Sequence, residues 1–218
     1  MKGRVVFLLD GGFIRKQLKP ALGRRPEADD VVAMVDHILK EPLLAGTELL
    51  RVFYYDAPPL ATKETHPISS KKVNFASTEQ GIHGLRLIRQ LELKEPYAVR
   101  LGETRMPAGR WTLKDSVLRE LVKSPRKLQK DDVLPGITQK GVDLRLGLDI
   151  AWISLKRLAE TIVIVTGDAD FLPALKFARK EGARVVLCPL GWRPRRELLA
   201  HADYVLDGVK PERFIRVD

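Results

Sequence analysis

In the last third of the chain, short runs of apolar and β-branched residues alternate with helical segments, and this alternation restricts the fold most. The predicted elements, in order, are a helix over about 143–160, a strand over 161–166, a helix over 171–180, a strand over 184–188, a helix over 195–202 and a strand over 204–207. Strands that alternate with helices indicate a parallel sheet covered by helices on both faces. We therefore expect an α/β fold with a central, mostly parallel sheet.

The first quarter of the chain shows the same pattern. A strand is predicted over 4–9, followed by a helix over about 13–19, a second helical segment that stops near Pro42, and a strand that ends near Tyr55. Residues 61–138 are less regular and rich in Lys and Arg, with one predicted strand over 97–103. The 218 residues suit one domain. We predict a single domain over 1–218, with a long basic insertion at about 61–138.

Aspartates follow two of the predicted strands. Asp10 comes directly after "VVFLL", and Asp168 comes after "IVIVTG". Gly11, Gly12 and Gly167 lie beside them and would allow sharp turns of the backbone. Because ligands of parallel α/β sheets bind beyond the carboxyl ends of the strands, we expect both carboxylates at one edge of the sheet.

The predicted helix before Asp168 contributes two more acids. Val142, Leu146, Asp149 and Ile153 share one side of this helix, so Asp149 takes a position where leucine is expected. Burial of an unpaired carboxylate is costly, and the site should therefore supply a metal ion or hydrogen-bond donors. Asp143 lies at the start of the same helix.

Several carboxylates at one edge repel one another, and a hard cation such as Mg²⁺ or Mn²⁺ is the usual resolution. Such ions hydrolyse phosphodiesters by activating a water and stabilising the leaving oxygen. The chain as a whole has a net charge of +10 and a pI of about 9.8. A basic surface around an acidic site favours a nucleic acid as partner and indicates a metal-dependent nuclease.

Each acid also has a structural interpretation. Asp170 could cap the following helix, with Pro173 in its first turn, and Asp143 could cap its own helix. Asp10 could serve as a turn residue, and Asp149 could accept hydrogen bonds from loop amides. The set of positions is more specific than any single aspartate.

Three stretches carry a resemblance to a known family, namely "FLLDGGF" (7–13), "QKGVDLRLGLDIA" (139–151) and "IVIVTGDADFLPALKFARKEGARVVL" (162–187). At these residues the chain resembles the NYN family of PIN-like ribonucleases, in its bacterial LabA-like branch. The resemblance implies a PIN-like, Rossmann-like three-layer fold. It also implies an acidic pocket that binds Mg²⁺ or Mn²⁺ and endonucleolytic cleavage of RNA.

The same resemblance assigns roles to five acids. Asp10 is the acid after the first strand, Asp143 is the aspartate of the "KGVD" motif, and Asp149 is the acid before an "IA"-like segment. Asp168 and Asp170 are the paired acids of "GDxDF". All five are expected to be catalytic, with Asp10, Asp149 and Asp168 as metal ligands. Gly12 replaces the asparagine of many relatives, which removes no carboxylate.

Basic residues of the insertion are candidates for RNA binding. We predict contacts from Lys140, which precedes the acidic helix, and from Arg110 and Lys127. Trp111 lies among them and could stack on a base. The alternative for these residues is a solvated surface with a half-buried tryptophan. A second basic stretch, "GWRPRRELL" (191–199), lies near the end of a strand.

The sequence thus predicts a Mg²⁺- or Mn²⁺-dependent endoribonuclease, with single-stranded or structured RNA as substrate. The alternative is a non-cleaving RNA-binding or regulatory module on the same fold. A haloacid-dehalogenase-like phosphatase is disfavoured, because it needs an aspartate where this chain has Gly12. The lone Cys188 excludes a disulfide within the chain. We further expect a cytoplasmic location, no membrane partner and a homodimer as one possible assembly.

Overall fold

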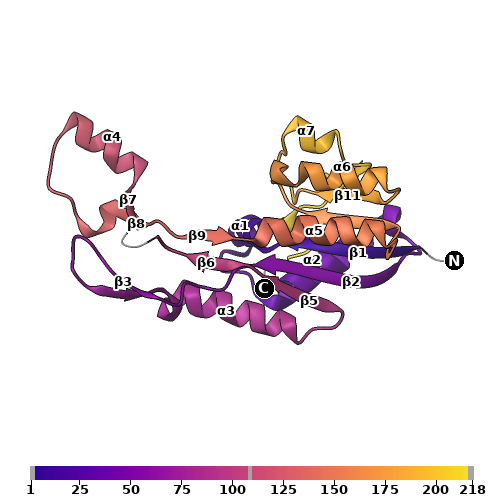
Figure 1. Cartoon of the computed structure of the whole chain (residues 1–218), viewed down its shortest axis with the longest axis horizontal. Helices are drawn as coiled ribbons and strands as arrows, with labels where there is room; N and C mark the ends of the chain where they lie inside the picture. Colours follow the sequence, from indigo (N-terminus) through magenta and orange to yellow (C-terminus); the bar gives the residue numbers. More distant parts are fainter. Residues whose placement is uncertain (1–2, 108–109, 216–218) are drawn as a thin grey trace.

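The computed structural model describes residues 3–107 and 110–215, which are built around a six-stranded sheet (Figure 1). The strands, in spatial order, are β12 (Tyr204–Val205), β11 (Arg184–Cys188), β10 (Thr161–Val165), β1 (Arg4–Asp10), β2 (Glu48–Asp56) and β5 (Tyr97–Leu101). Every neighbouring pair is parallel. The predicted α/β fold is confirmed, and its sheet is parallel throughout.

The register brings the ends of the central strands to one edge of the sheet. Leu9 of β1 aligns with Val165 of β10, and Asp10 aligns with Tyr55 of β2. The residues that follow these three strands therefore start from the same edge. We call this the carboxyl edge.

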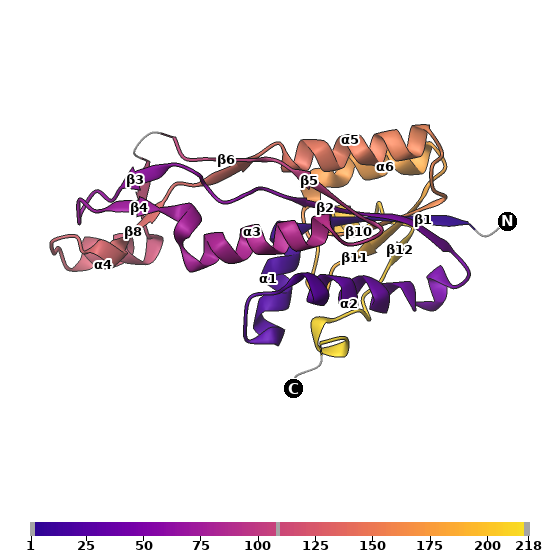
Figure 2. The ribbon, with the colours of Figure 1, turned by 90° about the horizontal axis from the view of Figure 1, so that it is seen from below.

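Helices cover both faces of the sheet, which gives three layers (Figure 2). One face carries α1 (Gly11–Leu22), α2 (Ala28–Leu39) and α3 (Glu79–Glu92), and the other carries α5 (Val142–Leu155), α6 (Leu172–Lys180) and the single turn α7 (Arg196–Leu199). Phe7 and Leu9 of β1 face the first group, whereas Val6 and Leu8 face the second. Because both faces are buried, the strand is apolar along its whole length instead of alternating.

Some helix boundaries differ from those predicted. Helix α1 begins directly at Gly11, because Asp10 caps it. Helix α5 ends at Leu155 rather than near 160, since Arg157 adopts a left-handed conformation with φ of 48°. In the part of the chain that the structure describes, no helix combines the length and the apolar composition that crossing a membrane requires.

Part of the predicted insertion belongs to the sheet. Strand β5, which was predicted, pairs with β2 as the edge strand, and α3 packs beneath it. Two further segments, 57–78 and 102–140 without 108–109, form what we call the arm. It projects beyond the carboxyl edge in both views (Figures 1 and 2).

Short antiparallel pairs build the arm. They are β3 (Lys63–Thr65) with β4 (Lys72–Asn74), β6 (Glu103–Arg105) with β9 (Thr138–Lys140), and β7 (Trp111–Leu113) with β8 (Val133–Pro135), together with helix α4 (Asp115–Lys123). Arg126 holds the loop after α4 through ion pairs with Glu120 and Asp132. Its hydrogen bonds lower the pKa of Asp132 to about 2. The arm is therefore an extension with its own short strands and helix, at the edge where the aspartates lie.

Candidate functional site

Asp10 lies at the carboxyl end of β1, in the middle of the sheet. Its Oδ1 accepts a hydrogen bond from the Phe13 amide at 3.0 Å, and its Oδ2 accepts one from the Thr166 hydroxyl at 2.9 Å. Burial raises the pKa of Asp10, although the two hydrogen bonds lower it. The negative charge of Asp168 raises this pKa further. The carboxylate is thus held in place next to a second acid.

Asp168 and Asp170 follow the neighbouring strand, β10. The Asp168 amide donates to the Thr166 hydroxyl at 3.1 Å, which links this loop to Asp10. Oδ1 of Asp168 accepts from the Asp170 amide at 2.9 Å and so caps the short 3-10 turn Ala169–Phe171. The structural alternative for Asp170 is wrong, since α6 begins after Phe171 with no capping side chain.

Asp143 lies in the first turn of α5, where its charge suits the helix dipole. The capping position belongs to Gly141, with φ of 74°, so the alternative of Asp143 as the cap is also wrong. Burial raises the pKa of Asp143, and the charges of Asp10, Asp168 and Asp170 raise it further. These mutual effects join the four acids, which we call the acidic cluster.

The acidic cluster lacks cationic partners. Among the ion pairs of the described residues, none involves Asp10, Asp143, Asp168 or Asp170. Within the same residues, no three His, Cys, Asp or Glu side chains form a ready-made metal site. The donors nevertheless fit a hard cation, because Mg²⁺ and Mn²⁺ prefer carboxylate oxygens and would relieve the mutual repulsion.

Asp149 is the one predicted acid that the structure does not bring to the cluster. It faces the sheet, as the helical spacing predicted, but its neighbours there are hydrogen-bond donors. Arg100 of β5 donates from Nε and Nη2 to the two carboxylate oxygens, at 2.9 and 2.8 Å. The Tyr55 hydroxyl of β2 donates at 2.8 Å. Asp149 therefore joins α5 to two strands, and its role as a metal ligand stays a prediction.

Two glycines beside the cluster are required by packing. A Cβ atom on Gly11 would come within 2.7 Å of the Tyr54 hydroxyl and the Tyr55 carbonyl oxygen. On Gly167 it would lie 2.7 Å from the Phe13 ring and 2.8 Å from the Trp192 ring. Neither glycine has a positive φ. Close approach, and not the sharp turn predicted from sequence, explains both residues.

Asp56 is a sixth acid at the carboxyl edge, and the sequence did not single it out. Its side chain is fully buried at the end of β2 and forms an ion pair with Arg15 of α1. The Ala57 amide donates to its Oδ1 at 2.7 Å, and the Tyr54 hydroxyl donates to its Oδ2 at 3.3 Å. Asp56 is thus neutralised, and it anchors α1 to the sheet.

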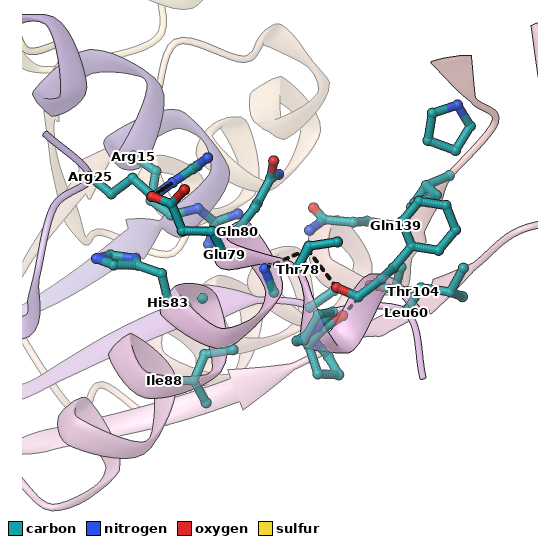
Figure 3. Close-up of a pocket in the computed structure, with 18 of the residues that line it drawn as sticks. Arg15, Arg25, Leu60, Thr78, Glu79, Gln80, His83, Ile88, Thr104 and Gln139 are labelled. Atoms are coloured by element: carbon teal, nitrogen blue, oxygen red, sulfur yellow. Dashed lines mark hydrogen bonds and ion pairs between the residues drawn. The ribbon is translucent and has the colours of Figure 1, made fainter. Parts of the chain in front are cut away.

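Between α1, the start of α3 and the arm lies a cavity of about 710 Å³, which we call the basic pocket (Figure 3). Its cationic wall consists of Arg15, Lys16 and Lys19 of α1 and Arg25 of the next loop. The opposite wall is formed by the start of α3 and by the arm. Arg15 also lowers the pKa of Asp10 through its charge, so pocket and cluster are electrostatic neighbours. The sequence signal was the run "RKQLK" directly after "DGGFI", which places cations on a helix that starts at the site.

The four predicted RNA contacts lie in the arm. Lys140, Arg110 and Lys127 are exposed, and Lys140 ends β9 just before α5. Trp111 is packed against His66, with ring centroids 4.6 Å apart, and its buried Nε1–H has no hydrogen-bond partner in the described ranges. The structure thus favours the alternative interpretation of Trp111, as a half-buried residue of the arm.

Comparisons with known proteins support the family resemblance. Residues 113–208 match the family model for the NYN domain, a range that includes Asp143, Asp168 and Asp170. No curated protein matches the chain. The fold is similar to the crystal structure of a protein of unknown function from Vibrio parahaemolyticus, with a TM-score of 0.52 and 12% identity. That alignment covers 94% of this chain and 91% of the other, and at this identity it shows the fold alone.

Proposed function

We propose that this chain, which carries an NYN domain of the PIN-like ribonuclease type over residues 113–208, is a Mg²⁺- or Mn²⁺-dependent endoribonuclease. The observation that carries the proposal is the acidic cluster, four carboxylates without cationic partners beside a basic pocket. An RNA strand would follow the basic residues and present a phosphodiester to the acids.

The four acids of the cluster would have different roles in metal binding. Asp10 and Asp168 would hold the ion, because both lie at ends of central strands whose positions the sheet fixes. Asp143 and Asp170 would complete the negative charge around it. When bound, the ion would activate the attacking water and stabilise the leaving oxygen. The Phe13 amide and the Thr166 hydroxyl orient Asp10 for this task.

Basic side chains would position the substrate. Lys16, Lys19 and Arg25 line the pocket, and Lys140 lies where the arm meets α5. Phosphate contacts of this kind bind RNA without reading its sequence, and they weaken as salt rises. For single strands each contact contributes about 0.7 to the slope of log affinity against log salt. Lys19→Gln and Arg25→Gln should each reduce this slope by roughly that amount.

A specific observation keeps the non-cleaving RNA-binding module as a second candidate. Both oxygens of Asp10 already accept hydrogen bonds, and no three of the acids form a ready-made metal site in the part of the chain described. Metal binding would therefore require the carboxylates to approach one another. A protein that binds RNA through the pocket without this step would not cleave.

The decisive experiment is cleavage of a labelled single-stranded RNA in Mn²⁺, with and without EDTA. Asp168→Asn and Asp10→Asn should reduce cleavage at least about 100-fold, since each removes a charge from the metal site. Asp29→Asn is the matched control, because the Asp29 side chain is 85% exposed on α2 and its ion-pair partner is Lys94, which belongs to neither the cluster nor the pocket. It should cleave as the wild type does.

The outcomes separate the two candidates. Cleavage that persists in EDTA, or in both cluster variants, would refute the metal-dependent nuclease. Salt-sensitive binding of RNA without cleavage in either metal would favour the non-cleaving module. Isothermal titration with Mn²⁺ would then show whether the cluster binds metal at all.

A further inference from the structure

Trp192 is an exposed aromatic residue beside the acidic cluster. Its side chain is 48% exposed, although tryptophan carries the largest apolar surface of any residue. One edge of its ring lies against Gly167, where a Cβ atom would come within 2.8 Å of Cδ1. Gly167 directly precedes Asp168. The indole is thus placed at the loop that carries two of the four carboxylates.

A strained turn holds Trp192 in this position. After β11, Leu190 and Gly191 both take positive φ values, 48° and 78°, and the Trp192 amide donates to the Pro189 carbonyl at 2.9 Å. A left-handed conformation is unfavourable for leucine, and it persists here because the Leu190 side chain is buried in the core. Such strain is concentrated at functional sites, and here it fixes an apolar side chain in solvent.

One cation lies over the exposed indole, and three more follow it in the chain. Nζ of Lys16 lies 5.4 Å from the centroid of the ring, and Lys16 also lines the basic pocket. Arg193, Arg195 and Arg196 follow in the chain and are exposed. An aromatic face flanked by positive charges is the arrangement that binds single-stranded nucleic acid, because bases stack while the cations contact phosphates.

The other tryptophans do not offer this arrangement. Trp111 packs inside the arm, and Trp152 lies on α5 in a stripe with the exposed residues Leu148 and Leu155. Trp152 is 52% exposed, so it matches Trp192 in accessibility but not in its surroundings. It therefore serves as a natural control.

We propose that Trp192 is a stacking platform for an unpaired nucleobase next to the phosphodiester held at the acidic cluster. The proposal rests on RNA being the ligand, as in the proposed function. A base inside a duplex has both faces covered by its neighbours, and only an unpaired base can stack on a side chain. The site would therefore select single-stranded RNA or an unpaired loop over a continuous duplex.

The test is the affinity of a labelled 12-nucleotide RNA, alone and as a duplex, measured by fluorescence anisotropy in EDTA. Trp192→Ala should weaken single-strand binding at least about fivefold, the loss of one base stack. Trp192→Phe should stay within about threefold of the wild type, because phenylalanine also stacks. Trp152→Ala should bind as the wild type does, and duplex binding should not change in any variant. Thermal melts confirm that each variant is folded.

Unchanged single-strand binding by folded Trp192→Ala would overturn the proposal. So would a loss in Trp192→Phe as large as that in Trp192→Ala, or an equal loss for duplex and single strand. Cleavage in Mn²⁺ is scored separately. Trp192-dependent binding without cleavage supports the stacking platform and contradicts the nuclease, whereas cleavage with Trp192-independent binding does the reverse.

Discussion

Substitution of Asp149 tests whether this residue is a structural acid or a metal ligand. Asp149→Asn preserves the shape of the side chain and can still accept from the Tyr55 hydroxyl, but it removes the charge that Arg100 binds through two hydrogen bonds. The Asp149 side chain is only 13% exposed, so water cannot fully replace this partner. The variant should therefore lose stability and keep the acidic cluster intact.

The expected loss follows from these contacts. A hydrogen bond to a charged group contributes roughly 1.5–3 kcal/mol, but the Arg100 side chain is 47% exposed and solvent screens the pair. We therefore expect a decrease of about 1–2 kcal/mol in the free energy of unfolding. For a chain of this length that corresponds to roughly 2–8 °C in melting temperature.

Urea unfolding gives the stability, and Mn²⁺-dependent RNA cleavage at low temperature gives the activity of the folded variant. Arg100→Gln should lose a similar amount of stability. The double variant should show a coupling energy of about 1 kcal/mol, because both changes remove the same Arg100–Asp149 interaction. Cleavage should stay within a few-fold of the wild type. If Asp149→Asn melts normally and cleaves as poorly as Asp168→Asn, Asp149 is a metal ligand and our reasoning is refuted.

Three further substitutions test the packing, the buried ion pair and the arm. Gly167→Ala places a methyl group 2.7 Å from an aromatic ring, and should cost about 1–3 kcal/mol in urea unfolding and impair RNA cleavage. Arg15→Met leaves the buried Asp56 carboxylate unpaired, and should cost about 3–5 kcal/mol, largely recovered when Asp56→Asn is added. Arg126 holds the pKa of Asp132 at about 2, below its ordinary value, so its stabilising effect is complete above about pH 4 and lost as pH falls towards 2. The difference in melting temperature between wild type and Arg126→Gln should therefore shrink over that interval.

The strand ends could be predicted from sequence because the signal is local. Each apolar run marks a buried parallel strand, and the polar residue after it must lie at the carboxyl edge. Asp10 and Asp168 were predicted in this way, and the structure places both at that edge. The position of Asp149 on the sheet side of its helix was equally predictable, since the helical period determines it.

The partners of these acids could not be predicted, because they come from distant parts of the chain. Arg100 reaches Asp149 only because β5 pairs with β2. The order of strands in a sheet cannot be predicted from the local sequence of any one strand. The same holds for the basic pocket, whose walls meet across α1, α3 and the arm. Local patterns thus identified which residues needed a partner, and only the fold showed whether that partner was a cation of the protein.

That distinction assigns the acids of the carboxyl edge to two groups. The Asp56 side chain is fully buried and the Asp149 side chain is 13% exposed, and each has an arginine that neutralises it. Of the cluster acids, Asp10 is half-buried, whereas Asp143, Asp168 and Asp170 are exposed. The four acids of the cluster have no such partner among the described residues, although the chain carries 38 Lys and Arg residues. The negative charges of the cluster raise the pKa values of Asp10 and Asp143, and a bound cation would relieve this repulsion. The missing counter-charge is therefore the feature that favours these four acids, and not Asp56 or Asp149, as the proposed metal site.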